Sequence, residues 1–169
     1  MITLEEFEDA YSGEHAPWQT HQWKVEAFPT INGKQIPIAL AEQVGLPYPQ
    51  FTERNKNIGS TEIFLAGGSN VGSFSITFGV DQRWRAVRYI SDWQETIQNP
   101  YTGGFRMPSQ YKKDITVGLY DGQGKRFAKA TVRNCWPLGI DGPQLETTAA
   151  LGQTAAQFKC DGFYIDWED

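Results

Sequence analysis

The sequence predicts a mainly β protein, with two packed antiparallel sheets forming a sandwich or barrel and one flanking α-helix at about residues 81–98. Three observations support this prediction. Short segments of alternating polar and apolar residues, separated by turn signals, recur about eight times along the chain. A single long segment has helical periodicity instead. The 169 residues and the net charge of −5 fit one globular domain over 1–169, with no long basic run for gripping nucleic acid.

The helix is predicted within Ser73–Gln98, which begins as a strand and changes period at Asp81. Beyond Asp81 the apolar residues recur at steps of three or four, as on one face of a helix: Trp84, Val87, Ile90, Trp93 and Ile97. We therefore expect Trp84 and Trp93 to dock the helix against the sheets. Asp81 is predicted to cap the helix, and Asn99–Pro100 to end it.

The N-terminal part is predicted to contain an arm, a strand and a hairpin turn. Residues 1–15 form the expected arm, in which Leu4–Tyr11 is either a short acidic helix or a segment that orders against a partner. Ala16–Phe28 contains an alternating strand. Asn32–Gly33 is a strong turn signal, because both residues accept positive φ. A strand over Lys34–Ala39 and one helical turn over Leu40–Gly45 are expected to follow.

Residues 46–72 are predicted to form an extended excursion from the domain. A charged strand, Gln50–Asn57, precedes a turn and a short strand, Thr61–Leu65. The glycine-rich run Ala66–Gly72 is predicted to be a flexible loop. A polar excursion of this length in a small domain is usually functional.

The C-terminal half is predicted to supply three further strands: Asp114–Tyr120, Arg126–Asn134 and Ala155–Trp167. Asp121–Gly124 joins the first two as a hairpin turn, and Trp136–Pro137 is expected to end the second. The last strand changes phase at Asp161–Gly162, which predicts a bulge. Arg106–Lys113 is predicted to be irregular.

Residue types that carry chemistry are present, but their spacing does not build a site. His15 and His21 lack a third metal ligand at a suitable separation. The run Gly67–Gly72 resembles a phosphate loop but has no lysine. Glu53 or Glu62 with Asp114 could form an acid/base pair, although nothing in the spacing requires them to meet. We therefore predict no enzyme activity, no metal and no cofactor.

Location signals point to the cytoplasm of the cell that makes the protein. No apolar run approaches the ~20 residues needed to span a membrane, and the acidic N-terminus does not match a signal peptide. Cys135 and Cys160 are predicted to be reduced thiols, on strands that could lie side by side.

Six tryptophans raise the alternative of a carbohydrate-binding sandwich, in which flat aromatic rings stack on sugars. Most of them occupy predicted helix or strand positions that are typical of cores and subunit interfaces. Trp18 alone is placed as a surface platform.

Several short motifs occur in the order found in the tail tube proteins of contractile-tailed bacteriophages, which are relatives of secretion-system tube subunits. The resemblance extends from about Gln22 to Trp167, and its motifs are Trp23–Pro29, Gly45-Leu46-Pro47, the strand and helix of Ser73–Gln98, Tyr111–Ile115, Leu119-Tyr120-Asp121, Asn134–Pro137 with Ile140, and Phe158 with Phe163–Trp167. Tyr48 stands where the family has a glycine.

This resemblance implies a ring of six subunits that contribute strands to a continuous inner β-barrel, with the helix outside, and rings that stack into a tube. DNA would pass through the lumen without specific binding. The segment 46–72 would reach a neighbouring ring through its charged and amide residues: Glu53, Arg54, Lys56, Asn57 and Glu62. Gln50–Asn57 and Thr147–Ala156 are short of large apolar residues, and we expect them to line the lumen. The protein would belong to the tail of the virion and assemble in the host cytoplasm.

The expected partners are copies of the chain itself, a surrounding sheath, and baseplate or terminator proteins. A sheath or solvent would face the polar side of the helix, which carries Arg85, Arg88, Asp92 and Glu95. The alternative within the same fold is a tube-initiator or baseplate ring subunit, which makes one ring instead of many.

Overall fold

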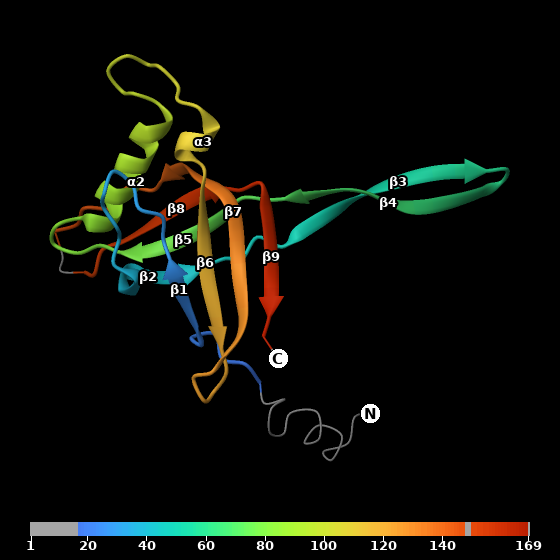
Figure 1. Ribbon diagram of the computed structural model, residues 1–169, viewed down its shortest axis with the longest axis horizontal. Coiled ribbons are helices and arrows are strands. Elements are labelled where there is room, and N and C mark those ends of the chain that lie inside the picture. The colour runs from blue at the N-terminus through green and yellow to red at the C-terminus, as the bar shows by residue number, and fades with distance from the viewer. Residues whose placement is uncertain (1–16, 148–149, 169) are drawn as a thin grey trace.

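The computed structural model describes residues 17–147 and 150–168 and confirms a mainly β fold with one long helix (Figure 1). In chain order its elements are β1 (Trp23–Ala27), η2 (Ile38–Leu40), β2 (Ala41–Val44), β3 (Pro49–Ile58), β4 (Thr61–Val71), β5 (Phe74–Gly79), α2 (Arg85–Ile97), α3 (Pro108–Tyr111), β6 (Lys113–Tyr120), β7 (Arg126–Ile140), β8 (Gln153–Lys159) and β9 (Gly162–Trp167).

Two antiparallel sheets share the long strand β7. The first part of β7 pairs with β6 and β9, and β1 pairs with β6; we call this the terminal sheet. The last part of β7 pairs with β8, which continues through β5 to β2; we call this the central sheet. The hairpin of β3 and β4 forms a separate two-stranded sheet.

The chain crosses between the two sheets twice, and both crossings differ from the prediction. β7 does not end at Trp136–Pro137 but continues to Ile140, because Asn134 adopts a left-handed conformation (φ 52°) that redirects the strand. Pro137 is tolerated because the register shifts between Pro137 and Gly139. The bulge predicted at Asp161–Gly162 is a full break, which separates β8 in the central sheet from β9 in the terminal sheet.

Both sheets and α2 contribute to one hydrophobic core. Val25, Ile115 and Val132 enter it from the terminal sheet, and Ile76 and Phe158 enter it from the central sheet. Helix α2 adds Ala86, Tyr89, Ile90 and Trp93. The central sheet therefore has the helix on its core side and leaves its other face free.

The prediction that Trp84 docks the helix against the sheets is wrong. This residue precedes the helix in a left-handed conformation (φ 53°) and is 40% exposed, so it does not share the buried face with Trp93. Asp81 does cap the helix, since its Oδ1 accepts from the N–H of Arg85 at 2.8 Å. That hydrogen bond, together with the Arg85 guanidinium, lowers the pKa of Asp81.

For the segment that precedes the β3–β4 hairpin, the local sequence pattern predicted the turn correctly but the secondary structure wrongly. Asn32 and Gly33 form the predicted turn with positive φ, but Lys34–Ala39 contains no strand. Leu40–Gly45 is not a helical turn, because Ala41–Val44 pairs with β5 as strand β2. The predicted irregular segment Arg106–Lys113 contains the short helix α3. The predicted arm at 1–15, including Leu4–Tyr11, lies outside the described residues.

Candidate functional site

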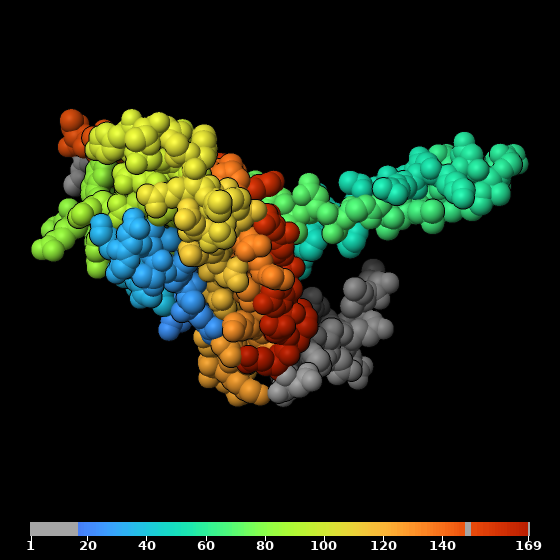
Figure 2. Space-filling model, turned by 45° about the horizontal axis from the view of Figure 1, so that its top comes forward, coloured from blue at the N-terminus to red at the C-terminus, as the bar shows by residue number. Residues whose placement is uncertain are grey.

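The β3–β4 hairpin is the most prominent exposed feature of the subunit. It extends well beyond the two-sheet body and stands clear of it in both views (Figures 1 and 2). The strands pair from Pro49 opposite Val71 to Ile58 opposite Thr61. Within the described residues, the hydrophobic core includes no side chain between Gln50 and Asn70. The hairpin therefore adds little to the body of the fold and is a candidate surface for contact with another molecule.

The glycine-rich run at the base of the hairpin is not the predicted loop. Ala66–Val71 continues β4, and the register shifts where Thr52 lies opposite Gly67 and Gly68. The Thr52 hydroxyl donates to the carbonyl of Gly68 at 3.1 Å. A Cβ atom at Gly67 would lie only 2.5 Å from Thr52 Oγ1 and 2.8 Å from its carbonyl oxygen. These glycines therefore form a bulge, which bends a strand and increases its twist.

Replacing Gly67 by alanine should distort this bulge at a cost of about 1–3 kcal/mol to local hairpin pairing, because the backbone oxygen of Thr52 cannot move away alone. Gly68→Ala is the matched control, since a Cβ there would have no heavy atom within 4 Å. Amide hydrogen exchange should accelerate in β3 and β4 of Gly67→Ala only. Equal exchange rates in the two variants would contradict the proposed close contact.

The five predicted contact residues all lie on this hairpin and are all exposed. Glu53, Asn57 and Glu62 occupy one face, as the pairing of Asn57 with Glu62 shows. Arg54 and Lys56 occupy the opposite face, where they pair with Leu65 and Ile63. Polarity alone did not predict this division of charge, although the alternation of acidic, basic and amide residues in Glu53–Asn57 was a signal for it.

The free face of the central sheet is a second candidate surface, and it is polar with almost no charge. Its residues alternate with the core residues on β2, β5, β8 and the end of β7, and they are Glu42, Gln43, Ser75, Thr77, Gly79, Trp136, Gly139, Gln153, Ala155, Gln157 and Lys159. Glu42 crosses over Gly79 and accepts from Gln153 Nε2 at 2.6 Å. The one carboxylate on this surface is therefore already hydrogen-bonded.

The predicted lumen segments map only partly onto this surface. Within Thr147–Ala156, Gln153 and Ala155 lie on the free face, but Thr154 and Ala156 point into the core. The other segment, Gln50–Asn57, belongs to the projecting hairpin and not to the central sheet. Strand alternation explains the difference, because only every second residue of a strand can face a lumen.

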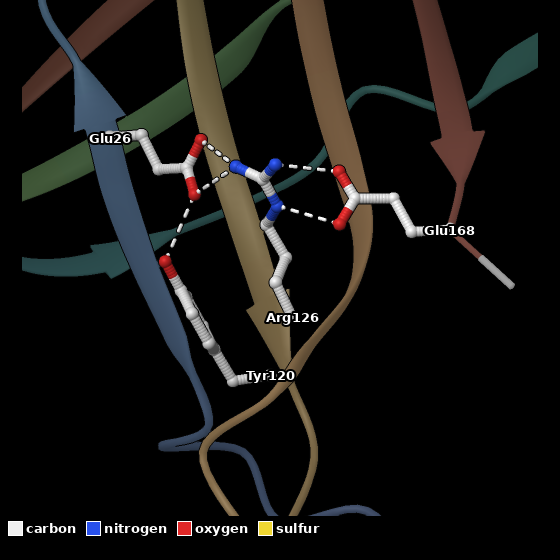
Figure 3. A network of polar contacts seen from close by, with 4 residues as sticks. All are labelled: Glu26, Tyr120, Arg126 and Glu168. Carbon is white, nitrogen blue, oxygen red and sulfur yellow. Dashed lines mark hydrogen bonds and ion pairs between the residues drawn. The ribbon is translucent and has the colours of Figure 1, made fainter.

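An arginine-centred network lies across the terminal sheet (Figure 3). Arg126 Nη1 donates to both carboxylate oxygens of Glu26, at 2.7 and 2.8 Å. Its Nε and Nη2 donate to Glu168 at 3.0 and 2.6 Å. The Tyr120 hydroxyl donates to Glu26 at 2.9 Å. The network thus links β1, β6 and β7 to Glu168, the residue after β9.

The network makes stability depend on pH. Burial raises the pKa of Glu26, but the hydrogen bonds from Arg126 and Tyr120 outweigh it and hold the pKa below its ordinary value of 4.5. A carboxylate of this kind stabilises the fold above its unfolded pKa, and the contribution disappears as pH falls through the lower folded pKa. We expect Glu26→Gln to cost about 1 kcal/mol at pH 7, and the difference from the unchanged protein to shrink below about pH 4.5.

Denaturant unfolding at a series of pH values measures this dependence. Glu95→Gln, at an exposed position on α2, is the control and should show no such pH-dependent difference. A constant penalty for Glu26→Gln down to pH 2 would contradict the proposed role of the charged carboxylate.

Glu62 and Asp114, considered as an acid/base pair, lie in different parts of the structure, and His15 lies outside the described residues. Glu62 accepts from Asn55 at 2.9 Å on the hairpin, whereas Asp114 accepts from the N–H of Asn134 at 2.9 Å in the body. Among the described residues, no three His, Cys, Asp or Glu side chains are grouped as metal ligands. No helix in the described part of the chain is long and apolar enough to cross a membrane.

Cys135 and Cys160 are free thiols in the buried core. Burial raises the pKa of Cys135, and negative charge on Cys160 would raise it further. Burial also raises the pKa of Cys160. Both therefore stay protonated at neutral pH and are poor nucleophiles.

Comparison with known proteins confirms the resemblance to tail tube proteins. The chain is 24% identical to the tail tube protein of Serratia phage KSP90, over 98% of this chain and 96% of the phage protein. No family model matches the sequence.

Solved structures show the same fold in contractile injection systems. A chain of the sheath-tube complex of the extracellular contractile injection system PVC, in its extended state, has a TM-score of 0.67 at 16% identity, over 99% of this chain and 100% of that one. A chain of the anti-feeding prophage baseplate also has a TM-score of 0.67, at 11% identity, over 89% of this chain and 96% of that one. The fold is therefore common to tube and baseplate components.

Proposed function

We propose that this chain, with the fold of contractile injection system tube components, is a structural subunit of a phage tail tube. Six subunits would close into a ring, and stacked rings would form a tube whose lumen conducts DNA during ejection. A sheath and baseplate or terminator proteins would be its partners. It would act in the virion tail after assembly in the host cytoplasm, with no catalytic step.

The observation that carries this proposal is the polarity of the central sheet. Its core face packs with α2, while its free face is built mostly of small and amide side chains, with one hydrogen-bonded carboxylate and with Trp136 and Lys159 at one end. A wall of this kind carries one cation, Lys159, at one end of β8 and offers few contacts to DNA phosphates, so a polyanion could slide past it. In a closed ring this face would line the lumen, and α2 would face outward.

Ring closure would also solve a problem of sheet edges. Among the described strands, β2 pairs only with β5 and the last part of β7 pairs only with β8, so each leaves one edge of the central sheet open. Open edges invite uncontrolled pairing with other chains. Pairing between neighbouring subunits would satisfy both edges in a heterologous interface that closes on itself.

Sedimentation velocity and negative-stain electron microscopy of the purified full chain test the proposal. We expect rings at moderate concentration and stacked tubes at high concentration. A monodisperse monomer without rings or filaments, at concentrations up to the millimolar range, would overturn the assignment.

The second candidate is a tube-initiator or baseplate ring subunit, which the TM-score of 0.67 to a baseplate chain favours. The same experiment separates the two: a single stable ring that never stacks indicates the initiator. For the carbohydrate-binding alternative, Trp18 is 46% exposed, and its indole N–H donates to the carbonyl of Tyr120 at 3.0 Å. Quenching of tryptophan fluorescence by sugars would favour that alternative over a tube subunit.

A further inference from the structure

The two faces of the β3–β4 hairpin carry opposite charge. Directly paired residues of antiparallel strands share a face, so the register between β3 and β4 determines which face each side chain occupies. We call one side the acidic face; it carries Phe51, Glu53, Asn55, Asn57, Glu62 and Phe64. We call the other side the basic face; it carries Arg54, Lys56, Ile58, Ile63 and Leu65.

Both faces also expose large apolar side chains. On the acidic face, Phe51 and Phe64 are 71% and 61% exposed; on the basic face, Ile58 and Leu65 are 57% and 52% exposed. An isolated two-stranded hairpin is marginally stable in water, and clustered exposed apolar residues mark an interaction surface. Each face of the hairpin therefore requires a partner.

We propose that hairpins of neighbouring copies stack face to face, with the acidic face of one hairpin against the basic face of the next. This inference rests on the proposed function, because it describes how the subunits of the assembly meet. Two carboxylates, Glu53 and Glu62, would oppose two cations, Arg54 and Lys56. The phenylalanine rings of the first face would pack against the aliphatic side chains of the second.

Charge complementarity identifies a second copy as the occupant. Each hairpin carries two carboxylates on one face and two cations on the other, so every junction in such a stack is neutral. A symmetric dimer would instead place like faces together, with Arg54 and Lys56 of both copies in one interface. The hairpin is therefore suited to a head-to-tail series, which a ring closes.

Complementary charge reversal tests the proposal. The double variant R54E/K56E has two acidic faces, and E53K/E62K has two basic faces. Each variant alone should fail to assemble, whereas an equimolar mixture should assemble with strict alternation. The control R83E/K125E makes the same charge change as R54E/K56E at exposed positions outside the hairpin and should assemble like the unchanged protein.

Sedimentation velocity gives the extent of assembly, and native mass spectrometry of mass-tagged variants gives the composition. Circular dichroism should be unchanged, because none of the substituted residues belongs to the described core. The milder pair R54Q/K56Q and E53Q/E62Q provides a second test, in which assembly should weaken at least tenfold and lose its dependence on salt.

Recovery only in the mixture, with equal numbers of the two variants, supports the stacking of hairpins. Assembly of either reversal variant alone would overturn it. Failure of the mixture while the unchanged protein assembles would also overturn it, because the faces would then meet other surfaces, and the proposed function would stand. Failure of the unchanged protein to assemble would overturn the proposed function and this inference together.

Discussion

Replacing Trp93 by alanine is expected to lower the free energy of unfolding by about 3–5 kcal/mol. Trp93 is fully buried, and its ring centroid lies 5.6 Å from that of Phe158 and 6.0 Å from that of Tyr89. Its indole N–H also donates to the carbonyl of Tyr111 at 2.7 Å. Truncation would leave a cavity between α2 and the central sheet and remove the partner of that carbonyl.

Urea unfolding followed by circular dichroism, at a concentration where the protein is monomeric, measures this effect. Trp84→Ala is the control, since Trp84 is 40% exposed and lies outside the helix's buried face. We expect it to cost less than about 1 kcal/mol. Equal costs for the two variants would show that α2 does not dock through Trp93.

Shortening the hairpin is expected to separate assembly from folding. In a variant with Thr52–Gly68 replaced by Asn-Gly, Phe51 and Ser69 remain paired across a two-residue turn. The body should retain its melting temperature within about 4 °C, because the removed residues contribute no side chain to the described core. Formation of rings and tubes should be lost.

The melting temperature and electron micrographs of the shortened chain provide the measurement. Gly68→Ala, which leaves the hairpin intact, is the control and should assemble normally. Tubes formed by the shortened chain would show that the hairpin is dispensable for assembly. Loss of the body's cooperative unfolding would show that it belongs to the fold.

Sequence periodicity predicted most elements whose pattern is complete within one segment. Trp23–Ala27, Phe74–Gly79 and α2 are examples, because each alternates or repeats against a single core. It failed for Ala41–Val44 and for Ala66–Val71, which are strands only because a distant or adjacent partner pairs with them. Pairing partners are invisible to a local pattern.

The candidate contact residues were identified by polarity alone. The sequence placed Glu53, Arg54, Lys56, Asn57 and Glu62 in one excursion, but it could not order them on two faces. That order depends on the register between β3 and β4, and a shift of one residue would exchange every side chain between the faces. Trp84 was misplaced for a related reason, since helical spacing alone does not show where a helix begins.

The sequence by itself determined the mainly β class, the position of helix α2 and the resemblance to tail tube proteins, because hydrophobic period and motif order are properties of the linear chain. Tertiary structure decided that β7 and the β8–β9 segment each serve two sheets, that the glycine-rich run is a bulged strand, and that opposite charges occupy opposite faces of the hairpin. These features depend on pairing between separate segments. The strands that pair are those that together bury apolar side chains in a shared core.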